Sequence, residues 1–249
     1  MSGHDVGIVI TALLASAVEF VEALTIVLAM GTTRGWRSAW AGVGAAVALL
    51  AAITAVGGYA LQEAVPEHTL QLVIGAALLL LGLQWLRKAV LRAAGLKALH
   101  DEDATYREQV EAGRAAPAER RFGLDWVGFA VTFKGVLLEG VEVVIIVIGF
   151  GVSSGSVGLA AAGAVLGGAI VIAAGFALHR PLSRVPENTM KFTVGLLLTT
   201  FGTFWAVEGL GGDWPGGDAV LPLLLALYGL AAWAAVRVLA ARRPHESRA

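Results

Sequence analysis

Four glutamates arranged as two pairs are the residues of this chain best placed to do chemistry. Glu19 and Glu22 lie in the apolar stretch SAVEFVEALTIVLAM, and Glu139 and Glu142 lie in GVLLEGVEVVIIVIG. Residues three apart are neighbours on the surface of a helix, so each pair directs two carboxylates toward one region. Carboxylate oxygens are the ligands that hard cations such as Ca²⁺, Mn²⁺ and Mg²⁺ prefer. We therefore expect all four glutamates to ligate a metal cation.

The composition places these glutamates in a membrane. The chain is 57% hydrophobic and only 15% charged, whereas a soluble domain carries about 25% charged residues. Windows of about 20 apolar residues, long enough to span a bilayer, occur near 8–30, 38–61, 70–87, 126–150, 157–178, 189–207 and 220–239. The sequence therefore predicts an all-α polytopic membrane protein with seven transmembrane helices.

The basic residues predict the orientation. With seven spans, every lysine and arginine except Lys134 falls on the face that holds the C-terminus. Cytoplasmic loops carry the excess of Lys and Arg. We therefore expect the N-terminus outside and the C-terminus in the cytoplasm.

The two halves of the chain resemble each other at a constant offset of 120 residues. The glutamate pairs match at this offset, and so do the segments VPEHTLQLVIGAALLLLGLQWL (65–86) and VPENTMKFTVGLLLTTFGTFWA (185–206). Each copy has three helices, an odd number, so the second copy must be inverted. Inverted repeats place their binding site near the bilayer midplane. The predicted organisation is a first repeat (1–94), a charged, partly helical cytoplasmic linker (95–124), a second repeat (125–210), and a seventh helix with a basic tail (211–249).

Buried carboxylates must be compensated. On insertion scales an acidic residue at the centre of a span costs about 2.5–3.5 kcal/mol, so four cost roughly 10 kcal/mol. A bound cation would offset this cost. The alternative is that the glutamates are protonated and hydrogen-bonded to neighbouring helices. Clustered carboxylates without a cation repel, so some keep their protons, and metal binding would release them.

Three further residues are candidates for a pathway or a gate. Lys134 precedes Glu139 by five residues and would either neutralise a glutamate or extend to the cytoplasmic interface. Thr199 and Thr203 lie one turn apart and would line a polar pathway, or else bond their own backbone. The chain contains no cysteine, which excludes disulfides and thiolate metal sites.

These features resemble the high-affinity iron permease family, whose members carry Arg-Glu-x-x-Glu in the first and fourth of seven helices. The resemblance rests on the two Glu-x-x-Glu motifs and covers the architecture of the whole chain. It implies inward transport of iron through the four glutamates. The family's motif arginines are absent, because Val18 and Leu138 stand in their places. The paired-carboxylate helices are also similar to those of a wider superfamily of inverted-repeat cation exchangers, which includes manganese and calcium exporters.

The sequence thus predicts a transporter or permease, not an enzyme, in the inner or plasma membrane. Its expected cargo is a hard metal cation, iron first and Mn²⁺ or Ca²⁺ next, with no permanently bound cofactor. Expected partners are the cation, the bilayer, and either a second copy or a periplasmic or extracellular iron-handling protein, but no nucleic acid. Two other functions stay open: an intramembrane metal-dependent enzyme, and a non-transporting membrane subunit or sensor.

Overall fold

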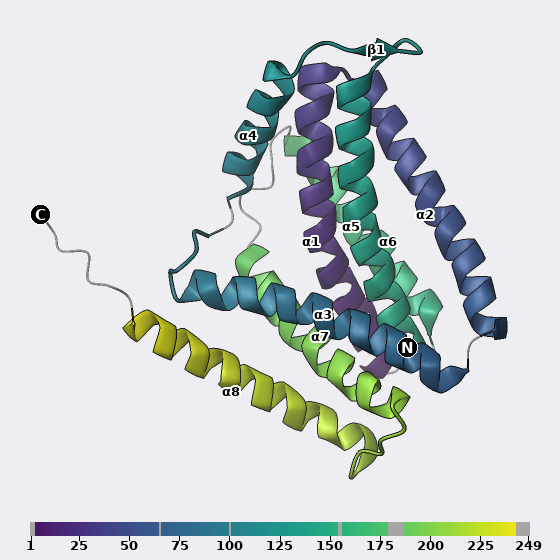
Figure 1. The fold of residues 1–249 in the computed structure, drawn as a ribbon, viewed down its shortest axis with the longest axis vertical. Coiled ribbons are helices and arrows are strands. Elements are labelled where there is room, and N and C mark those ends of the chain that lie inside the picture. Colours follow the sequence, from purple (N-terminus) through teal and green to yellow (C-terminus); the bar gives the residue numbers. More distant parts are fainter. Residues whose placement is uncertain (1–2, 65, 100, 154–155, 179–186, 243–249) are drawn as a thin grey trace, which may run out of the picture. The chain divides into compact units, whose positions relative to one another are not determined.

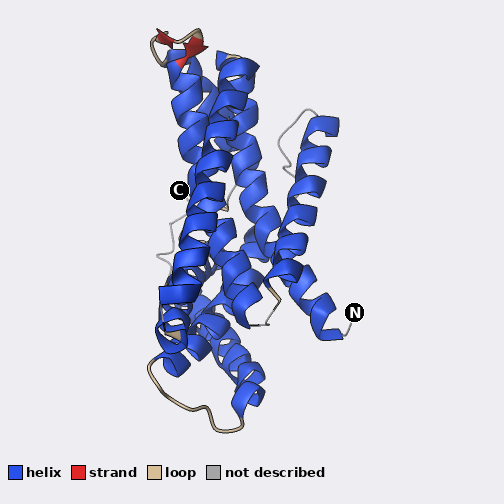
Figure 2. Cartoon of the chain, turned by 90° about the vertical axis from the view of Figure 1, so that its right-hand side faces the viewer, coloured by secondary structure: helices blue, strands red, loops and turns tan. Residues whose placement is uncertain are grey.

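The computed structural model describes residues 3–64, 66–99, 101–153, 156–178 and 187–242 of the 249-residue chain. Nearly all of these residues are helical (Figure 1). The strands among them are β1 (Arg120–Arg121) and β2 (Leu124–Asp125), a short antiparallel hairpin drawn in red in Figure 2. The predicted all-α fold class is therefore confirmed.

Each of the seven predicted spans lies within one helix. These helices are α1 (Gly3–Arg34), α2 (Trp36–Ala64), α3 (Glu67–Ala93), α5 (Trp126–Ser153), α6 (Val157–Leu178), α7 (Glu187–Gly209) and α8 (Val220–Ala241). The charged linker contributes one further helix, α4 (Glu102–Ala115), and the β1–β2 hairpin.

Six of these helices are long and apolar enough, among the described residues, to cross a membrane. The chain is therefore a multi-pass membrane protein by length and composition. The helix outside this set is α5, which contains Lys134, Glu139 and Glu142 close together. These three charged residues, and not a low hydropathy, separate α5 from the other six helices, and its crossing of the bilayer stays a prediction.

The chain divides into two compact units, and each combines helices from both predicted repeats. One unit contains Met1–Ala64 and Asp101–Val185, and the other contains Val65–His100 and Pro186–Ala249. In the first unit α1 packs against α5 and α6, and α2 packs against α5. In the second unit α3 packs along α7, and α8 contacts both. The glutamate pairs, on α1 and α5, belong to the first unit.

Glycine contacts in the second unit recur at the 120-residue offset found in the sequence. A Cβ atom on Gly82 of α3 would lie 2.5 Å from the Thr199 backbone nitrogen of α7. A Cβ atom on Gly202 of α7 would meet the Leu79 backbone nitrogen of α3 in the same way. Gly202 lies 120 residues after Gly82, and Thr199 lies 120 residues after Leu79. The same relation holds for a second pair of contacts, Gly75 with Ala206 and Gly195 with Leu86.

The first unit shows a corresponding pair of contacts. A Cβ atom on Gly42 of α2 would lie 2.7 Å from the Phe129 carbonyl oxygen of α5. A Cβ atom on Gly163 of α6 would lie 2.5 Å from the Val9 carbonyl oxygen of α1. Val9 and Phe129 are 120 residues apart, and Gly42 and Gly163 are 121 residues apart. Within each unit, contacts that recur in this exchanged form support a two-fold relation between the matching helices.

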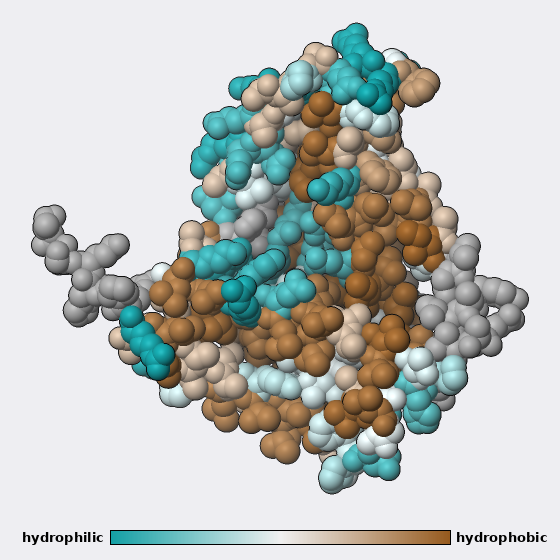
Figure 3. All heavy atoms as spheres, viewed as in Figure 1, coloured by the Kyte–Doolittle hydropathy of each residue, from teal (hydrophilic) through white to brown (hydrophobic). Residues whose placement is uncertain are grey.

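Helix α4 of the linker packs on the end of α1. Tyr106 and Val110 of α4 contact a buried cluster that contains Ala29 and Met30 of α1. The Thr32 hydroxyl lies 3.3 Å from the Tyr106 hydroxyl. Hydrophilic side chains cover α4 and the hairpin, whereas hydrophobic ones cover much of the remaining visible face (Figure 3). This contrast supports a linker in water and helices in lipid.

Candidate metal centre

The candidate centre lies where α1 and α5 approach each other closely. Gly135 of α5 permits this approach, because a Cβ atom there would lie 2.6 Å from Ile26 Cδ1 of α1. Gly140, next to Glu139, similarly leaves room for the side chain of Leu50 from α2. Small residues at helix contacts let backbones come together in membranes. The sequence of α5 therefore brings its carboxylates within reach of α1.

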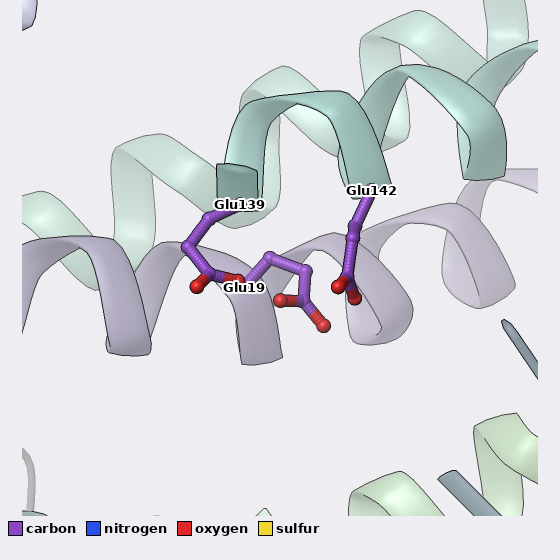
Figure 4. Close-up of side chains that lie close together, drawn as sticks. All are labelled: Glu19, Glu139 and Glu142. Atoms are coloured by element: carbon purple, nitrogen blue, oxygen red, sulfur yellow. The ribbon is translucent and has the colours of Figure 1, made fainter. Parts of the chain in front are cut away.

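Three of the four predicted glutamates converge. Carboxylate oxygens of Glu19, Glu139 and Glu142 all lie within 4.8 Å of one another. Glu19 comes from α1, and Glu139 and Glu142 come from α5 (Figure 4). Glu19 is only 1% exposed, and the other two are half-buried. Residues 120 positions apart in the sequence thus meet across one helix interface.

The spacing of these oxygens is compatible with a shared cation. Ca²⁺ holds oxygen ligands at about 2.3–2.6 Å, so two ligands on opposite sides of the ion lie up to about 5 Å apart. Three carboxylates this close would repel if all were ionised. The cluster is therefore a place where positive charge, either a metal ion or protons, is needed. Its assignment to a metal stays a prediction.

Glu22 is not part of this cluster. Its side chain is half-buried, and its carboxylate is not among those that lie within 4.8 Å of one another. Three residues along a helix correspond to a rise of about 4.5 Å and a rotation of about 300°. With Glu19 directed into the α1–α5 contact, Glu22 is displaced along and around α1. The described side chains thus bring together three of the four predicted ligands, and a role for Glu22 stays a prediction.

The predicted gating and pathway residues occupy different surroundings. Lys134 is exposed and forms no ion pair with the described part of the chain. The Thr199 hydroxyl donates to the Gly195 carbonyl at 2.7 Å, one turn earlier in α7. The Thr203 hydroxyl donates to the Thr199 carbonyl at 2.8 Å and lies 2.7 Å from the Tyr228 hydroxyl of α8. Both threonines thus bond their own backbone in the second unit, and their pathway role stays a prediction.

One residue near the cluster was not singled out in the sequence. Ser16 lies three residues before Glu19 on α1, is fully buried, and its hydroxyl has no hydrogen-bond partner among the described residues. Buried hydroxyls are nearly always hydrogen-bonded, so Ser16 is a candidate to ligate a cation through its oxygen, or to donate a hydrogen bond to a water, at the cluster. The spacing Ser-x-x-Glu was visible in the sequence, but the burial of the hydroxyl was not.

Comparison with known protein families gives one match. Residues 22–93 match the family model described as "Divalent cation/proton antiporter GDT1". The match runs from Glu22 in α1 to the end of α3, which is less than a third of the chain, and does not include Glu19, Glu139 or Glu142. Comparison with curated proteins and with solved structures gave no match. Over this segment the chain is similar to a family of cation transporters, not to the iron permeases specifically.

Proposed function

We propose that this chain is a transporter that carries a divalent metal cation across the bilayer, with Glu19, Glu139 and Glu142 as the ligands. The observation that carries the proposal is the convergence of three carboxylates from two apolar helices. Acidic residues inside membrane spans mark ion pathways. The similarity of residues 22–93 to divalent cation/proton antiporters supports the same cargo and favours a transporter over an enzyme.

The ligand atoms favour a hard cation. The clustered acidic ligand atoms are carboxylate oxygens, with no histidine among them, and the chain contains no cysteine. Carboxylates suit Mg²⁺, Ca²⁺ and Mn²⁺, whereas imidazole suits iron and zinc. We therefore place Mn²⁺ and Ca²⁺ first as cargo and keep iron in the proposal as Fe²⁺.

Exchange with protons follows from the charge of the cluster. A divalent ion neutralises two of the three carboxylates, and the third keeps a proton. When the ion leaves, like-charge repulsion raises the affinity of the empty cluster for protons. Binding of the cation and binding of protons therefore compete at the same oxygens, which couples the two flows.

Transport also requires α5 to cross the membrane. Its 28 residues extend about 42 Å at 1.5 Å per residue, which exceeds the hydrocarbon thickness of about 30 Å. We propose that α5 is the fourth of seven spans, with the N-terminus outside and the basic C-terminal tail in the cytoplasm. The cluster would then lie near the middle of the bilayer.

A cation panel tests the proposal. Mn²⁺, Ca²⁺, Fe²⁺ (without oxygen) and Mg²⁺ are added to the purified protein while thermal unfolding is followed. At 100 times its Kd, a bound cation stabilises the folded state by about 2.7 kcal/mol. Glu19→Gln and Glu139→Gln are expected to lose this stabilisation, and Glu119→Gln, in the exposed linker, is expected to keep it.

Transport is measured separately in proteoliposomes that contain a metal indicator and a pH indicator. Wild-type protein is expected to move the preferred cation and protons in opposite directions. Normal flux in both glutamate variants would show that the cluster is not the site. Metal binding without flux would instead favour a sensor or a non-transporting subunit.

A further inference from the structure

We propose that the first unit binds one anionic phospholipid, with an acyl chain in an apolar cavity and the headgroup phosphate at Arg37. The cavity has a volume of about 300 Å³ and lies between α1, α2, α5 and α6, within the first unit. Its wall is almost wholly apolar. Glu19 is among its lining residues, but the Glu19 Oε1 atom is fully buried. The cavity therefore offers little to a polar ligand and suits a hydrocarbon chain.

The cavity opens between α2 and α6. Trp40 and Val47 of α2 and Ile172 of α6 line it and are 49%, 53% and 42% exposed. Both helices are long and apolar enough to cross a membrane, so the opening faces lipid. An empty cavity forfeits dispersion contacts, and a lipid chain that fills it regains them without any loss of hydration. A chain from the surrounding bilayer is therefore the natural occupant.

The length of the cavity matches one leaflet of the bilayer. Its lining residues on α2 run from Trp40 to Leu50, which at 1.5 Å per residue is about 15 Å. The hydrocarbon core is about 30 Å thick, so a chain of one leaflet also extends about 15 Å. At the far end of the cavity Leu50 packs against Gly140, next to Glu139. A chain in the cavity would thus extend from the membrane surface to the neighbourhood of the glutamate cluster.

The end of the cavity near Trp40 has the features of a membrane–water interface. The rings of Trp36 and Trp40 are stacked, with centroids 6.5 Å apart, and Trp side chains are enriched at the headgroup level of membranes. Ser38 Oγ accepts a hydrogen bond of 2.9 Å from the Asp125 backbone nitrogen. Asp125 belongs to the hairpin, which hydrophilic side chains cover (Figure 3). The start of α2 therefore lies at the depth of the lipid headgroups.

Arg37 is the residue that would hold the phosphate. Its side chain is exposed and forms no ion pair with the described residues, whereas the neighbouring Arg34 is already paired with Asp125. Arginine binds phosphate oxygens through two parallel hydrogen bonds. Residues three or four apart share one face of a helix, and Arg37 continues in these steps the face of α2 that lines the cavity, which comprises Trp40, Val43, Val47 and Leu50.

A photoreactive lipid tests the position of the chain. The protein is placed in phosphatidylcholine nanodiscs with a trace of phosphatidylglycerol that carries a diazirine midway along one acyl chain. After irradiation, labelled peptides are identified by mass spectrometry. We expect 43–50 of α2 and 136–144 of α5 to be labelled at least about fivefold more than the region of α8 around Leu227, which is 57% exposed, a preference of about 1 kcal/mol. Equal labelling of α2, α5 and α8 would show an unspecific lipid shell and would overturn the proposal.

Matched variants separate the chain from the headgroup. Val43→Phe and Val47→Phe fill the cavity from α2, and Arg37→Gln removes the charge at its end. All three are expected to lower the labelling of α2 and α5 at least about fivefold. The controls are Val165→Phe, at an α6 position that is 70% exposed and outside the cavity, and Arg242→Gln, at the exposed end of α8. Both controls should be labelled as wild type.

The headgroup is tested with the same photoreactive chain on phosphatidylcholine, whose positive charge opposes that of Arg37. This lipid should label wild-type protein as weakly as phosphatidylglycerol labels Arg37→Gln. Labelling that is unchanged in both filled variants would show that the chain lies outside the cavity. Labelling that is unchanged in Arg37→Gln would show that this residue does not hold the phosphate. Either result contradicts the proposal.

The lipid site and the transport function fail separately. The lipid site rests on the cavity, on Arg37 and on the position of α2 in the membrane, and it uses no metal. If no cation stabilises the protein but labelling concentrates in the cavity and depends on Arg37, transport is wrong and this inference stands. If cations stabilise the protein and labelling is uniform, this inference is wrong and transport stands.

Discussion

Arg34 Nη1 lies 3.3 Å from Asp125 Oδ2, and this ion pair joins the last residue of α1 to the residue before α5. Both side chains are well shielded, with exposures of 8% and 14%. Arg34 also donates from Nε to the Gly113 carbonyl of α4 at 2.6 Å, and Asp125 Oδ1 accepts from the Gly128 backbone nitrogen of α5 at 2.8 Å. The two helices that carry the glutamates are thus fastened together at one end, with the linker helix attached.

Removal of Asp125 should therefore weaken both the fold and the site. Asp125→Ala loses the N-terminal cap of α5, worth about 1 kcal/mol, and a hydrogen bond to a charged group, worth about 1.5–3 kcal/mol. We expect the free energy of unfolding to fall by about 2.5–4 kcal/mol, and metal affinity to fall as well. Denaturant unfolding and the cation panel measure these effects. The control is Glu119→Ala, which breaks an exposed ion pair with Arg121. It should lower the free energy of unfolding by less than about 1 kcal/mol. Equal losses of stability in Asp125→Ala and Glu119→Ala would refute the argument.

Ser16→Ala should have opposite effects on stability and on metal binding. The Ser16 hydroxyl is buried without a partner among the described residues, so its removal abolishes a desolvation cost and leaves no new unpaired group. We expect the free energy of unfolding without metal to be unchanged or to rise by up to about 1 kcal/mol. We expect the Kd for the metal to rise. Thr132→Val is the control, because its buried hydroxyl also lacks a partner in the described part of the chain but lies against Gly42 of α2. A metal Kd that does not change in Ser16→Ala would remove this residue from the site.

Glu142→Gln and Glu22→Gln should distinguish a glutamate of the cluster from the one that lies outside it. Glu142 belongs to the cluster and Glu22 does not. Glu142→Gln removes one charged ligand, and we expect it to raise the metal Kd at least about tenfold, equivalent to about 1.4 kcal/mol. Glu22→Gln is expected to change the Kd much less. Calorimetric titration of the preferred cation measures both constants. A larger loss in Glu22→Gln would mean that the bound state recruits Glu22 by rotation of α1.

The glycines of the α3–α7 contact should tolerate no side chain. In Gly82→Ala the new Cβ atom would lie 2.5 Å from the Thr199 backbone nitrogen, and a backbone cannot move aside as a flexible side chain can. We expect Gly82→Ala, and its counterpart Gly202→Ala, to lower stability by about 1–3 kcal/mol through overpacking. Gly229→Ala in α8, where a Cβ atom would meet nothing within 4 Å, is the control. Similar thermal stability of all three variants would show that the contact is looser than described.

The sequence was sufficient to predict the helices, because each apolar window became one helix and the 120-residue offset reappeared in the glycine contacts. It did not predict the two units. The matching segments 65–86 and 185–206 indicated a repeat, but nothing in either sequence indicated that the two segments pack on each other. The sequence also did not predict that Glu22 lies outside the cluster. The i, i+3 spacing places Glu19 and Glu22 near each other, whereas the rotation of α1, with Val18 and Val21 also buried, decides which carboxylate meets α5.

Single cysteines can decide whether α5 crosses the membrane, because the natural chain contains none. Ala112→Cys lies on the exposed side of α4 before this helix, and Ser156→Cys follows it. If α5 crosses, the two positions lie on opposite faces of the bilayer. Because the basic linker is expected inside, a membrane-impermeant maleimide should label Ser156→Cys in intact cells and Ala112→Cys only after permeabilisation. Asp213→Cys, in the exposed turn after α7, should label from outside as a control.

Labelling of Ser156→Cys and Ala112→Cys from the same side would mean that α5 does not span the bilayer. The glutamates that α5 carries could not then serve a transmembrane pathway.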